Sequence, residues 1–256
     1  MSLPSSPIVV IPARLSSTRL PNKPLADIGG YPMIIHVWRR ALEADIGPVL
    51  VACGDLEILE VIKDFGGNAV ITNPSHPSGS DRIYEALEKF DPSQNFDAVI
   101  NLQGDLPTIR IELLQSVLGP LKDINVDIAT LVADMVDLSQ RSNPNVVKAV
   151  LAMGPGGRSG RALYFSRSAV PWCSDDGDNN KLVFYHHIGI YAYRREVLKH
   201  FVSLPPGQLE KREMLEQLRA LEDGMVIHAT RVDTIPLGVD TFADLECARE
   251  ILAITK

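Results

Sequence analysis

The sequence predicts an α/β fold with a single doubly wound, mostly parallel sheet and an antiparallel annex. In the first half, short apolar runs alternate with amphipathic stretches, which is the rhythm of repeated βαβ units. These runs are continuous rather than alternating, as is typical of strands that are covered on both faces. In the second half, two apolar runs flank a glycine-rich link at 154–160, and this arrangement predicts a hairpin.

The elements of the first half follow from local patterns. The run at 8–11 (Ile-Val-Val-Ile) predicts a buried strand. A helix is expected over 32–44, because proline suits a first helical turn and Gly47 and Pro48 follow the last one. The same reasoning predicts strands near 49–53, 69–72 and 98–102, a helix that Asp55 caps, and a helix over about 80–90.

The second half has a different organisation. Its patterns predict strands near 146–152, 162–165, 187–193 and 226–230, and helices over about 211–221 and 241–254. The polar stretch 172–181, which contains Asp175, Asp176 and Asp178, predicts a surface loop. Because no repeat and no linker rich in Pro, Gly or Ser marks a boundary, we expect one domain over residues 1–256.

The composition disfavours several classes of function. The chain has 25 Lys and Arg against 32 Asp and Glu, a net charge of −7, so it lacks the basic excess of a general nucleic-acid binder. Its 3 cysteines cannot all pair and show no C-x-x-C spacing, which disfavours a disulfide framework or a zinc site. No apolar run approaches the roughly 20 residues of a membrane helix, and residues 1–7 lack the basic segment of a signal peptide. We expect a cytoplasmic protein with no nucleic-acid or membrane partner.

A loop suited to phosphate follows the first predicted strand. Residues 12–24 contain Arg14, Arg19 and Lys23 among hydroxyl side chains and prolines. Ligands of open α/β sheets bind beyond the carboxyl ends of the strands, and Arg and Lys match phosphate oxygens. A plain solvated loop is nearly as compatible with this composition. The absence of G-x-x-x-x-G-K-[ST] and of G-x-G-x-x-G disfavours a P-loop NTPase and a dinucleotide dehydrogenase.

Two aspartates at predicted strand-to-helix junctions are candidate ligands of a cation. Asp105 follows a predicted strand, and Asp240 precedes the last predicted helix. Mg²⁺ takes few protein oxygens and shares its other positions with water and substrate phosphates. Each aspartate also has a plain alternative role. Asp105 could cap a turn before Pro107, and Asp240 or Thr241 could cap the last helix together with Asp244.

A pair of histidines begins a further predicted strand. Neighbouring side chains of a strand point to opposite faces, so only one of His186 and His187 can face a site. His187 shares its face with Tyr191. Such a pair is usually one surface and one core residue, and Glu216 and Gln217, within a predicted helix, would ordinarily be solvated.

Taken together, the motifs resemble the 3-deoxy-manno-octulosonate (Kdo) cytidylyltransferases. The opening loop alone looks like any nucleotidyltransferase that joins a sugar to a nucleotide, whereas the YFSR, HIGIY and EMLEQLR blocks are more specific to Kdo. The resemblance runs in family order across nearly the whole chain. The matching blocks are VIPAR at 10–14, STRLP at 17–21, KPL at 23–25, NLQGD at 101–105, NPNVVK at 143–148, LYFSR at 163–167, HIGIY at 187–191, EMLEQLR at 213–219 and GVDT at 238–241.

The resemblance implies a Rossmann-like sheet of the nucleotide-diphospho-sugar transferase type, with a sugar-binding and dimerisation annex around 160–220. It implies the reaction CTP + Kdo → CMP-Kdo + pyrophosphate, which feeds lipopolysaccharide assembly, in a homodimer. The residues implied for the nucleotide are Pro12, Ala13, Arg14, Arg19, Lys23, Ser78, Gly79, Ser80, Arg82 and Gln103. The residues implied for the sugar are Arg167, His187, Tyr191, Glu216 and Gln217. Mg²⁺ would be held by Asp105 and Asp240, which with Arg14 and Lys23 form the implied catalytic set.

Several positions depart from the pattern of that family. Ser80-Asp81 replaces Thr-Glu before Arg82, which keeps a hydroxyl and a carboxylate, and the link at 154–160 is longer and more polar than usual. Leu106 stands where Glu commonly follows QGD, which removes a charge beside the implied metal site. Cys53-Gly54-Asp55 replaces a Thr-Asp pair after the second predicted strand, so the resemblance assigns no role to Asp55. None of these changes removes an implied ligand, and we expect an active enzyme.

Rival functions make different demands on the sequence. Another CMP-sugar synthetase, such as one that uses sialic acid, would share the phosphate loop but should lack EMLEQLR. A catalytically silent nucleotide-sugar-binding module would be credible if Asp105, Asp240 or Lys23 were replaced, and all three are present. A Rossmann oxidoreductase would need the glycine fingerprint, which is missing after the first strand.

Overall fold

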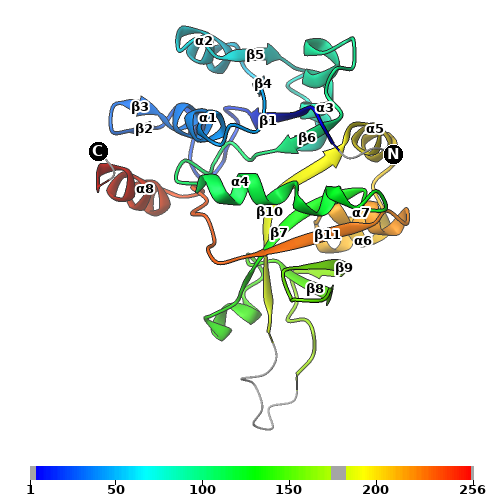
Figure 1. Cartoon of the computed structure of the whole chain (residues 1–256). Coiled ribbons are helices and arrows are strands. Elements are labelled where there is room, and N and C mark those ends of the chain that lie inside the picture. Colours follow the sequence, from blue (N-terminus) through cyan, green and yellow to red (C-terminus); the bar gives the residue numbers. More distant parts are fainter. Residues whose placement is uncertain (1–3, 174–182, 255–256) are drawn as a thin grey trace. The chain divides into compact units, whose positions relative to one another are not determined.

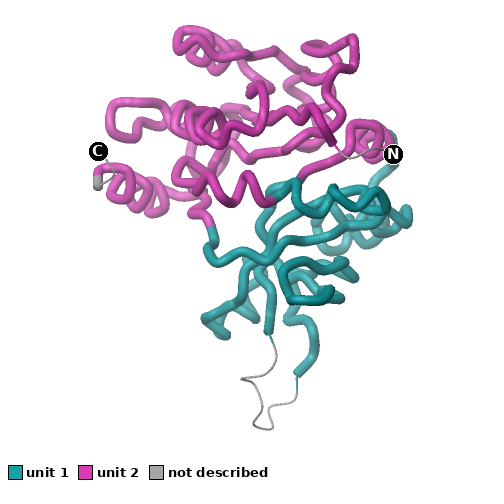
Figure 2. The backbone as a smooth tube through the Cα atoms, viewed as in Figure 1, with its two compact units in different colours: residues 1–3, 117–191, 203–235 teal, residues 4–116, 192–202, 236–256 magenta. Residues whose placement is uncertain are grey.

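The computed structural model describes residues 4–173 and 183–254, and its chain divides into two units (Figures 1 and 2). Unit 1 contains Val117–Tyr191 and Ser203–Ile235, and unit 2 contains Pro4–Ser116, Ala192–Val202 and Pro236–Lys256. The expectation of one domain over 1–256 with an annex around 160–220 stays a prediction. The loop predicted at 172–181 lies, from residue 174 onward, outside the described residues.

Unit 2 is built on parallel strands, which are ordered β5 (Asn68–Ile71), β4 (Val49–Cys53), β1 (Pro7–Ala13) and β6 (Ala98–Asn101). Helices that pack against them are α1 (Met33–Glu43), α2 (Leu56–Asp64) and α3 (Gly79–Phe90). The apolar run of β1 and all of β4 are buried, as strands covered on both faces should be. The core of this unit therefore lies along its sheet, and the carboxyl ends of its parallel strands share one edge.

The rest of unit 2 consists of shorter elements and terminal helices. These are the 3-10 helix η1 (Lys23–Leu25), the small hairpin of β2 (Asp27–Ile28) and β3 (Tyr31–Pro32), and the helices α4 (Ile111–Val117), α5 (Arg195–Ser203) and α8 (Phe242–Ile254). The sequence patterns above predict α8 but not α4, α5 or the small hairpin.

Unit 1 carries strands of mixed direction, in the order β10 (Tyr185–Arg194), β7 (Ile128–Asp134), β11 (Ile227–Val232), β9 (Ser159–Ser166) and β8 (Lys148–Met153). Strand β11 is parallel to β7 but antiparallel to β9, and β8 is antiparallel to both β9 and β10. Its other elements are η2 (Gly119–Lys122), η3 (Leu138–Ser142), α6 (Gln208–Glu213) and α7 (Gln217–Glu222).

The predicted fold class is confirmed as α/β, but the sheet is mixed. The parallel arrangement holds for the strands of unit 2. In unit 1 the hairpin predicted around 154–160 is present, and it turns through Gly156 and Gly157, which both have positive φ. A hairpin reverses the chain where a helical crossover does not, so these strands run antiparallel.

One predicted helix, over 211–221, is wrong as a single element. The chain leaves α6 at Met214, which adopts the left-handed conformation with φ 55°, and α7 begins at Gln217. The carboxylate of Glu213 accepts hydrogen bonds from the Ser166 hydroxyl at 2.7 Å and the Arg167 backbone N–H at 2.9 Å. These bonds to β9 accompany the break in the helix, and helical periodicity alone does not reveal them.

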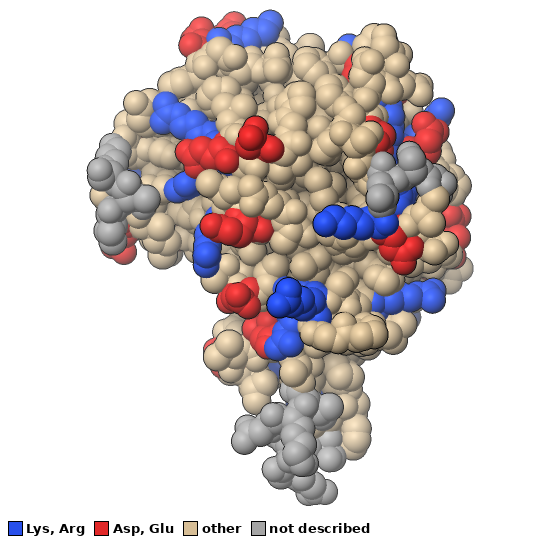
Figure 3. Space-filling view, in the orientation of Figure 1, with Lys and Arg blue, Asp and Glu red and all other residues tan. Residues whose placement is uncertain are grey.

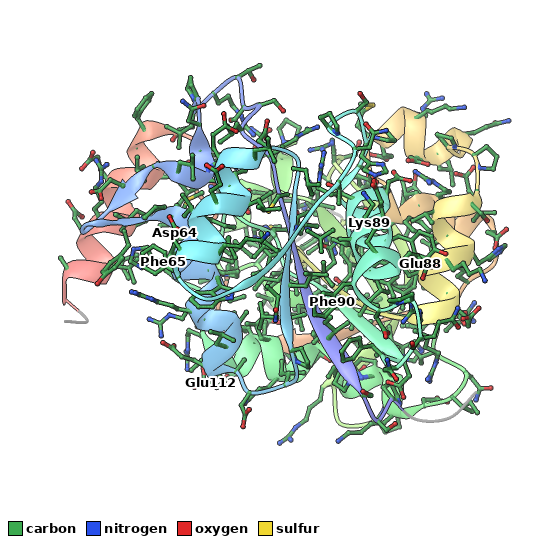
Figure 4. The ribbon with its side chains drawn as sticks, turned by 90° about the horizontal axis from the view of Figure 1, so that it is seen from above. Asp64, Phe65, Glu88, Lys89, Phe90 and Glu112 are labelled. Carbon is green, nitrogen blue, oxygen red and sulfur yellow. The ribbon has the colours of Figure 1, made fainter. Side chains whose placement is uncertain are left out.

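A buried ion pair in unit 2 joins α5 to the end of α3. The guanidinium of Arg195 donates to Asp91 at 2.5 Å and to Glu88 at 2.8 Å, and Figure 4 labels Glu88 on α3. Burial raises the pKa of Asp91, but the backbone N–H groups of Asn95 and Phe96 and the Arg195 cation outweigh burial and hold that pKa at about 2. Asp91 is therefore a buried carboxylate that is ionised in the folded chain.

Replacing this carboxylate tests the role of the ion pair in stability. We expect Asp91→Asn to lower the free energy of unfolding at neutral pH by about 3 kcal/mol, because it leaves Arg195 buried without its charge partner. The folded pKa of about 2 lies below the unfolded value of about 3.9. The contribution of Asp91 is thus present above pH about 4 and lost as pH falls toward 2.

Urea unfolding over a series of pH values measures both effects. The matched control is Glu88→Gln, whose carboxylate is partly exposed and should contribute less than about 1 kcal/mol. An Asp91→Asn variant that matched the parent in stability at neutral pH would contradict the prediction.

Candidate functional site

Three segments of unit 2 meet at the ammonium group of Lys23. Its Nζ donates to Asp105 Oδ2 at 2.8 Å and to Asp240 Oδ1 at 3.0 Å. The second carboxylate oxygen of Asp240 lies 3.0 Å from Arg19 Nη2. Burial lowers the pKa of Lys23, but the two carboxylates outweigh burial and raise that pKa above its ordinary value. Lys23 is therefore a cation held between two anions.

These groups line a hollow of about 340 Å³ at the end of β1. Its lining consists of the predicted phosphate loop, the QGD segment and Asp240. The residues are Pro12, Ala13, Arg14, Ser16, Ser17, Thr18, Arg19, Lys23, Pro24, Gln103, Gly104, Asp105 and Asp240. Most of the nucleotide residues implied by the resemblance thus surround one space, at the edge where a parallel sheet binds ligands.

The plain alternative for Asp240 is not what the structure shows. Thr241 and Asp244 perform the capping at the start of α8: Asp244 Oδ2 accepts from the Thr241 backbone N–H at 2.8 Å, and Thr241 Oγ1 accepts from the Asp244 N–H at 3.3 Å. The side chain of Asp240 is left to pair with Lys23 and Arg19. The carboxylate of Asp105 likewise accepts a hydrogen bond from Lys23, and its backbone carbonyl accepts one from the Val239 N–H at 2.9 Å.

Apolar packing holds these segments in place. Leu20 from the phosphate loop and Val239 from the segment before α8 belong to one buried cluster with Ile28, Met33 and Leu245. Leu20 and Val239 are near neighbours in sequence of Lys23 and Asp240. The charged junction therefore rests on a water-excluded layer that limits the movement of its two loops.

Two of the departures from the family pattern, at Asp55 and Leu106, have structural roles. Asp55 precedes α2 as predicted, but its carboxylate makes no hydrogen bond to that helix; Oδ2 instead accepts from the Leu15 backbone N–H at 2.8 Å and so anchors the phosphate loop. Leu106 is buried, and a Cβ placed at Gly238 would lie 4.0 Å from its Cδ2. An apolar side chain at position 106 therefore suits its surroundings.

Gly54 gives two arginines room to approach. A Cβ at this position would lie 2.9 Å from Arg82 Nη1 and 3.1 Å from Arg14 Cβ. Arg82 is buried, and its Nη1 donates to Thr72 Oγ1 at 2.7 Å and to the Asn73 carbonyl at 3.2 Å. Burial and the nearby Arg14 charge lower the pKa of Arg82.

The predicted segment around Ser78 forms the start of α3. Ser78 caps the helix by accepting from the Asp81 N–H at 3.1 Å, and Ser80 is buried. A Cβ at Gly79 would lie 3.5 Å from Pro12 Cγ, so this helix start borders the phosphate loop. Ser78, Gly79, Ser80 and Arg82 stand near the loop without lining the hollow itself.

Among the predicted sugar residues of unit 1, Arg167 is tightly held. Its Nε donates to the Glu213 carbonyl at 2.9 Å, Nη1 to the Pro144 carbonyl at 2.9 Å and Nη2 to the Met214 carbonyl at 3.3 Å. A guanidinium has five N–H groups, so two remain for another acceptor. The guanidinium of Arg167 is therefore partly engaged by backbone carbonyl oxygens.

Lys148 holds the same region from the inside. It is fully buried, and its Nζ donates to the carbonyls of Asn143 at 3.0 Å, Val146 at 2.7 Å and Arg167 at 2.5 Å. Burial lowers the pKa of Lys148, while the Glu213 charge raises it. Lys148 and Glu213 stand within the NPNVVK and EMLEQLR blocks, but residue type and spacing alone did not indicate this bonding.

Two of the other predicted sugar residues, His187 and Gln217, are buried, while Tyr191 and Glu216 are half-buried. His187 is buried, and its ring lies edge-on to Phe165 and 5.5 Å from the ring of Tyr191. Gln217, expected to be solvated, is buried at the start of α7, and its Nε2 has no hydrogen-bond partner among the described residues. Glu216 directly precedes α7. A buried amide donor without a partner is costly unless a ligand completes it.

The described residues offer limited means of holding a metal. Nowhere in residues 4–173 and 183–254 do three or more His, Cys, Asp or Glu side chains gather as a metal cluster. Asp105 and Asp240 nevertheless place carboxylate oxygens around one cationic group, that of Lys23. This donor set fits Mg²⁺, provided that phosphate oxygens and water supply its other ligands.

The surface charge and the helices of the described chain point to no further function. Charges of both signs are interspersed over the face drawn in Figure 3. No helix within the described part of the chain is both long and apolar enough to cross a membrane.

Comparisons with known proteins place the chain among cytidylyltransferases. The family model described as Cytidylyltransferase matches residues 8–227. The chain is 58% identical over 247 residues to a 3-deoxy-manno-octulosonate cytidylyltransferase of Paramagnetospirillum magneticum, with 96% of this chain and 98% of that protein covered. It is 57% identical to the protein of the same name from Rhodospirillum centenum, with 97% and 94% covered.

Solved structures agree with this assignment. A CMP:2-keto-3-deoxy-manno-octonic acid synthetase complexed with CTP matches with a TM-score of 0.89 and 39% identity, over 98% of this chain and 100% of that one. A nucleotidyl transferase from Methanothermobacter matches with a TM-score of 0.60 and 16% identity, over 98% and 99% of the two chains, and shows similarity of fold alone.

The close approach at Gly54 leads to a test of stability. We expect Gly54→Ala to lower the free energy of unfolding by about 1–3 kcal/mol, because the new methyl group displaces Arg82 from its buried hydrogen bonds. Urea unfolding measures the change. The matched control is Gly119→Ala, whose added methyl group would meet Thr230 Oγ1 at an ordinary 3.8 Å. Equal stability of the Gly54→Ala variant and the parent would show that Arg82 can move aside freely.

Proposed function

The chain belongs to the 3-deoxy-manno-octulosonate cytidylyltransferase family, and we propose that it transfers CMP from CTP to Kdo, giving CMP-Kdo and pyrophosphate for lipopolysaccharide assembly. The observation that carries this proposal is the junction of Lys23, Asp105 and Asp240 in a hollow lined by the basic loop. It combines phosphate-binding cations with carboxylates on one edge of a parallel sheet, as a nucleotidyl transfer requires.

The basic loop serves the triphosphate in this proposal. Arg14 and Arg19 offer planar forks of donors, and Lys23 a point charge, all on the wall of one hollow. The anomeric hydroxyl of Kdo attacks the α-phosphorus, the bond to the pyrophosphate oxygen breaks, and the hydroxyl proton is released. The cations stabilise the negative charge on the phosphate oxygens during this displacement.

Asp105 and Asp240 are the proposed ligands of Mg²⁺. When bound, this ion supplies positive charge to the phosphate oxygens and lowers the pKa of the attacking hydroxyl. The carboxylates have Lys23 and Arg19 as partners in the chain alone. We therefore infer that nucleotide strengthens metal binding, because two carboxylates and water alone form a weak site for Mg²⁺.

The sugar is proposed to bind in unit 1. Arg167 keeps two N–H groups for the carboxylate of Kdo, and its position is set by backbone acceptors on two segments. His187, Tyr191, Glu216 and Gln217 are the proposed partners of the sugar hydroxyls. The buried, unpartnered Nε2 of Gln217 supports this assignment, since a substrate oxygen would satisfy it.

Homodimer formation and a cytoplasmic location, both expected from the sequence and the resemblance, stay predictions.

The proposal is tested by CTP-dependent release of pyrophosphate with a panel of acid sugars. We expect Kdo to be the preferred acceptor and sialic acid to be used poorly or not at all. Preference for sialic acid would favour the related class of CMP-sugar synthetase. Binding of CTP with no turnover of any acid sugar would indicate a silent binding module.

Asp105→Asn tests the proposed metal ligand. We expect turnover to fall by orders of magnitude at saturating Mg²⁺, because the amide lacks the charge that holds a divalent cation beside the phosphates. Urea unfolding should show an intact fold. The matched control is Asp64→Asn, at the exposed end of α2, which should keep normal turnover (Figure 4). Near-normal turnover of Asp105→Asn would remove this residue from the site.

Gln217→Ala tests the proposed sugar pocket. The Michaelis constant for Kdo should rise about tenfold while that for CTP changes little, because loss of one buried donor leaves a sugar oxygen unpaired. Steady-state kinetics with each substrate varied in turn measure the two constants. Gln208→Ala, at an exposed position on α6, is the control. Equal effects on both substrates, or none, would mean that the sugar binds elsewhere.

A further inference from the structure

The hydroxyl of Thr130 lies at the centre of a small buried network in unit 1. Thr130 stands on β7 and has no exposed surface. Its Oγ1 lies 2.9 Å from the Ile190 carbonyl oxygen and 3.2 Å from the Ile188 carbonyl oxygen, both on β10. The same oxygen lies 3.0 Å from Nε2 of His187.

The number of protons in this network determines the form of the histidine. A threonine hydroxyl carries one proton and can also accept. Carbonyl oxygens only accept, so the single proton of Thr130 is needed for them. The third neighbour, Nε2 of His187, must then donate to the hydroxyl oxygen. If Nε2 were unprotonated, its lone pair and the two carbonyl oxygens would all face the single hydroxyl proton.

The ring is neutral, so it carries only this one proton. Burial, followed by the neighbouring His186, lowers the pKa of His187 to about 3. A neutral imidazole that is protonated at Nε2 has a lone pair at Nδ1. Within residues 4–173 and 183–254, the hydrogen bonds of His187 are made by Nε2 and the backbone N–H.

Packing keeps the ring in this orientation. Its centroid lies 4.9 Å from that of Phe165 in an edge-on arrangement and 5.5 Å from that of Tyr191. The backbone N–H of His187 donates to the Val147 carbonyl at 2.8 Å. A flip of the ring about its Cβ–Cγ bond would place Cε1 where Nε2 lies and break the contact with Thr130, so the network opposes it.

We propose that Thr130 is a positioning residue that holds His187 in the Nε2–H tautomer, so that Nδ1 accepts a hydrogen bond from a sugar hydroxyl. This inference rests on the proposed function, in which His187 contacts Kdo. It adds a chemical requirement to that role: the sugar substituent that faces Nδ1 of His187 must be a hydrogen-bond donor. A sugar with a deoxy or methoxy group there would leave the nitrogen unpaired and bind more weakly.

The tautomer can be tested without any substrate. In protein with ¹⁵N-labelled histidine, His187 is assigned by the signals that disappear in His187→Gln. We expect its Nε2 to resonate as a protonated and its Nδ1 as an unprotonated ring nitrogen. The reverse pattern, or a mixture of the two tautomers, would overturn the proposal. This measurement holds whether or not the chain makes CMP-Kdo.

Kinetics test the consequence for the sugar. Thr130→Val keeps the shape of the side chain and removes the hydroxyl; we expect a Michaelis constant for Kdo about tenfold higher, an unchanged constant for CTP and a shift in the His187 tautomer signals. Thr130→Ser restores the hydroxyl and should recover parental values of all three. The serine variant and the parent spectrum keep the test decisive if the valine variant does not fold.

The outcomes separate the two proposals. A parent protein that makes no CMP-Kdo contradicts the proposed function, while its spectrum still decides the tautomer. With an active parent, an equal rise of both Michaelis constants in Thr130→Val, or unchanged kinetics with unchanged tautomer signals, would show that Thr130 is merely structural.

Discussion

The junction at Lys23 connects segments that lie far apart in the sequence. Its ammonium group bonds Asp105, 82 residues away, and Asp240, 217 residues away. Neither carboxylate is engaged in capping a helix; Asp105 pairs with Lys23, and Asp240 pairs with Lys23 and Arg19. These ion pairs, with the buried apolar cluster beneath them, hold the three segments next to one another. The hollow beside them takes its form from this constraint.

The same charge balance explains how such a site can respond to a triphosphate. In the chain without ligands, cations of the basic loop form ion pairs with the two carboxylates. Phosphate oxygens compete for those cations, and the carboxylates then need another positive partner. In the proposed function, a divalent ion held by Asp105 and Asp240 would provide that partner. The proposed function therefore implies, for an electrostatic reason, that nucleotide and metal bind cooperatively.

In unit 1, buried polar groups hold the proposed sugar residues. Lys148 directs its ammonium to three backbone carbonyls, one of which belongs to Arg167, and Glu213 binds the Arg167 backbone N–H. A buried network that is fully satisfied is rigid, because any movement leaves a donor or acceptor unpaired. Arg167 can thus keep one arrangement before the sugar arrives, which reduces the entropy lost on binding.

Local pattern was sufficient for the parts of the fold that depend on burial and periodicity. The continuous apolar runs predicted β1, β4 and β6, and the predicted helix over 32–44 corresponds to α1 at Met33–Glu43. The expected hairpin around 154–160 is present. The same patterns did not predict α4, β7 or α5. The predicted helix over 211–221 was wrong, and hydrogen bonds from Glu213 to the end of β9 accompany its break.

For the candidate site, the sequence by itself determined the kinds of residues and their place after strands. The resemblance added a family, and the comparisons confirmed it. Residue type alone left Asp240 equally able to cap a helix, Gln217 solvated and Asp55 without a role. Only the tertiary structure decided that Thr241 and Asp244 form the cap, that Gln217 is buried, and that Asp55 holds Leu15. The physical reason is that hydrogen-bond and charge partners are chosen by proximity in space, and these partners come from segments that no local pattern connects.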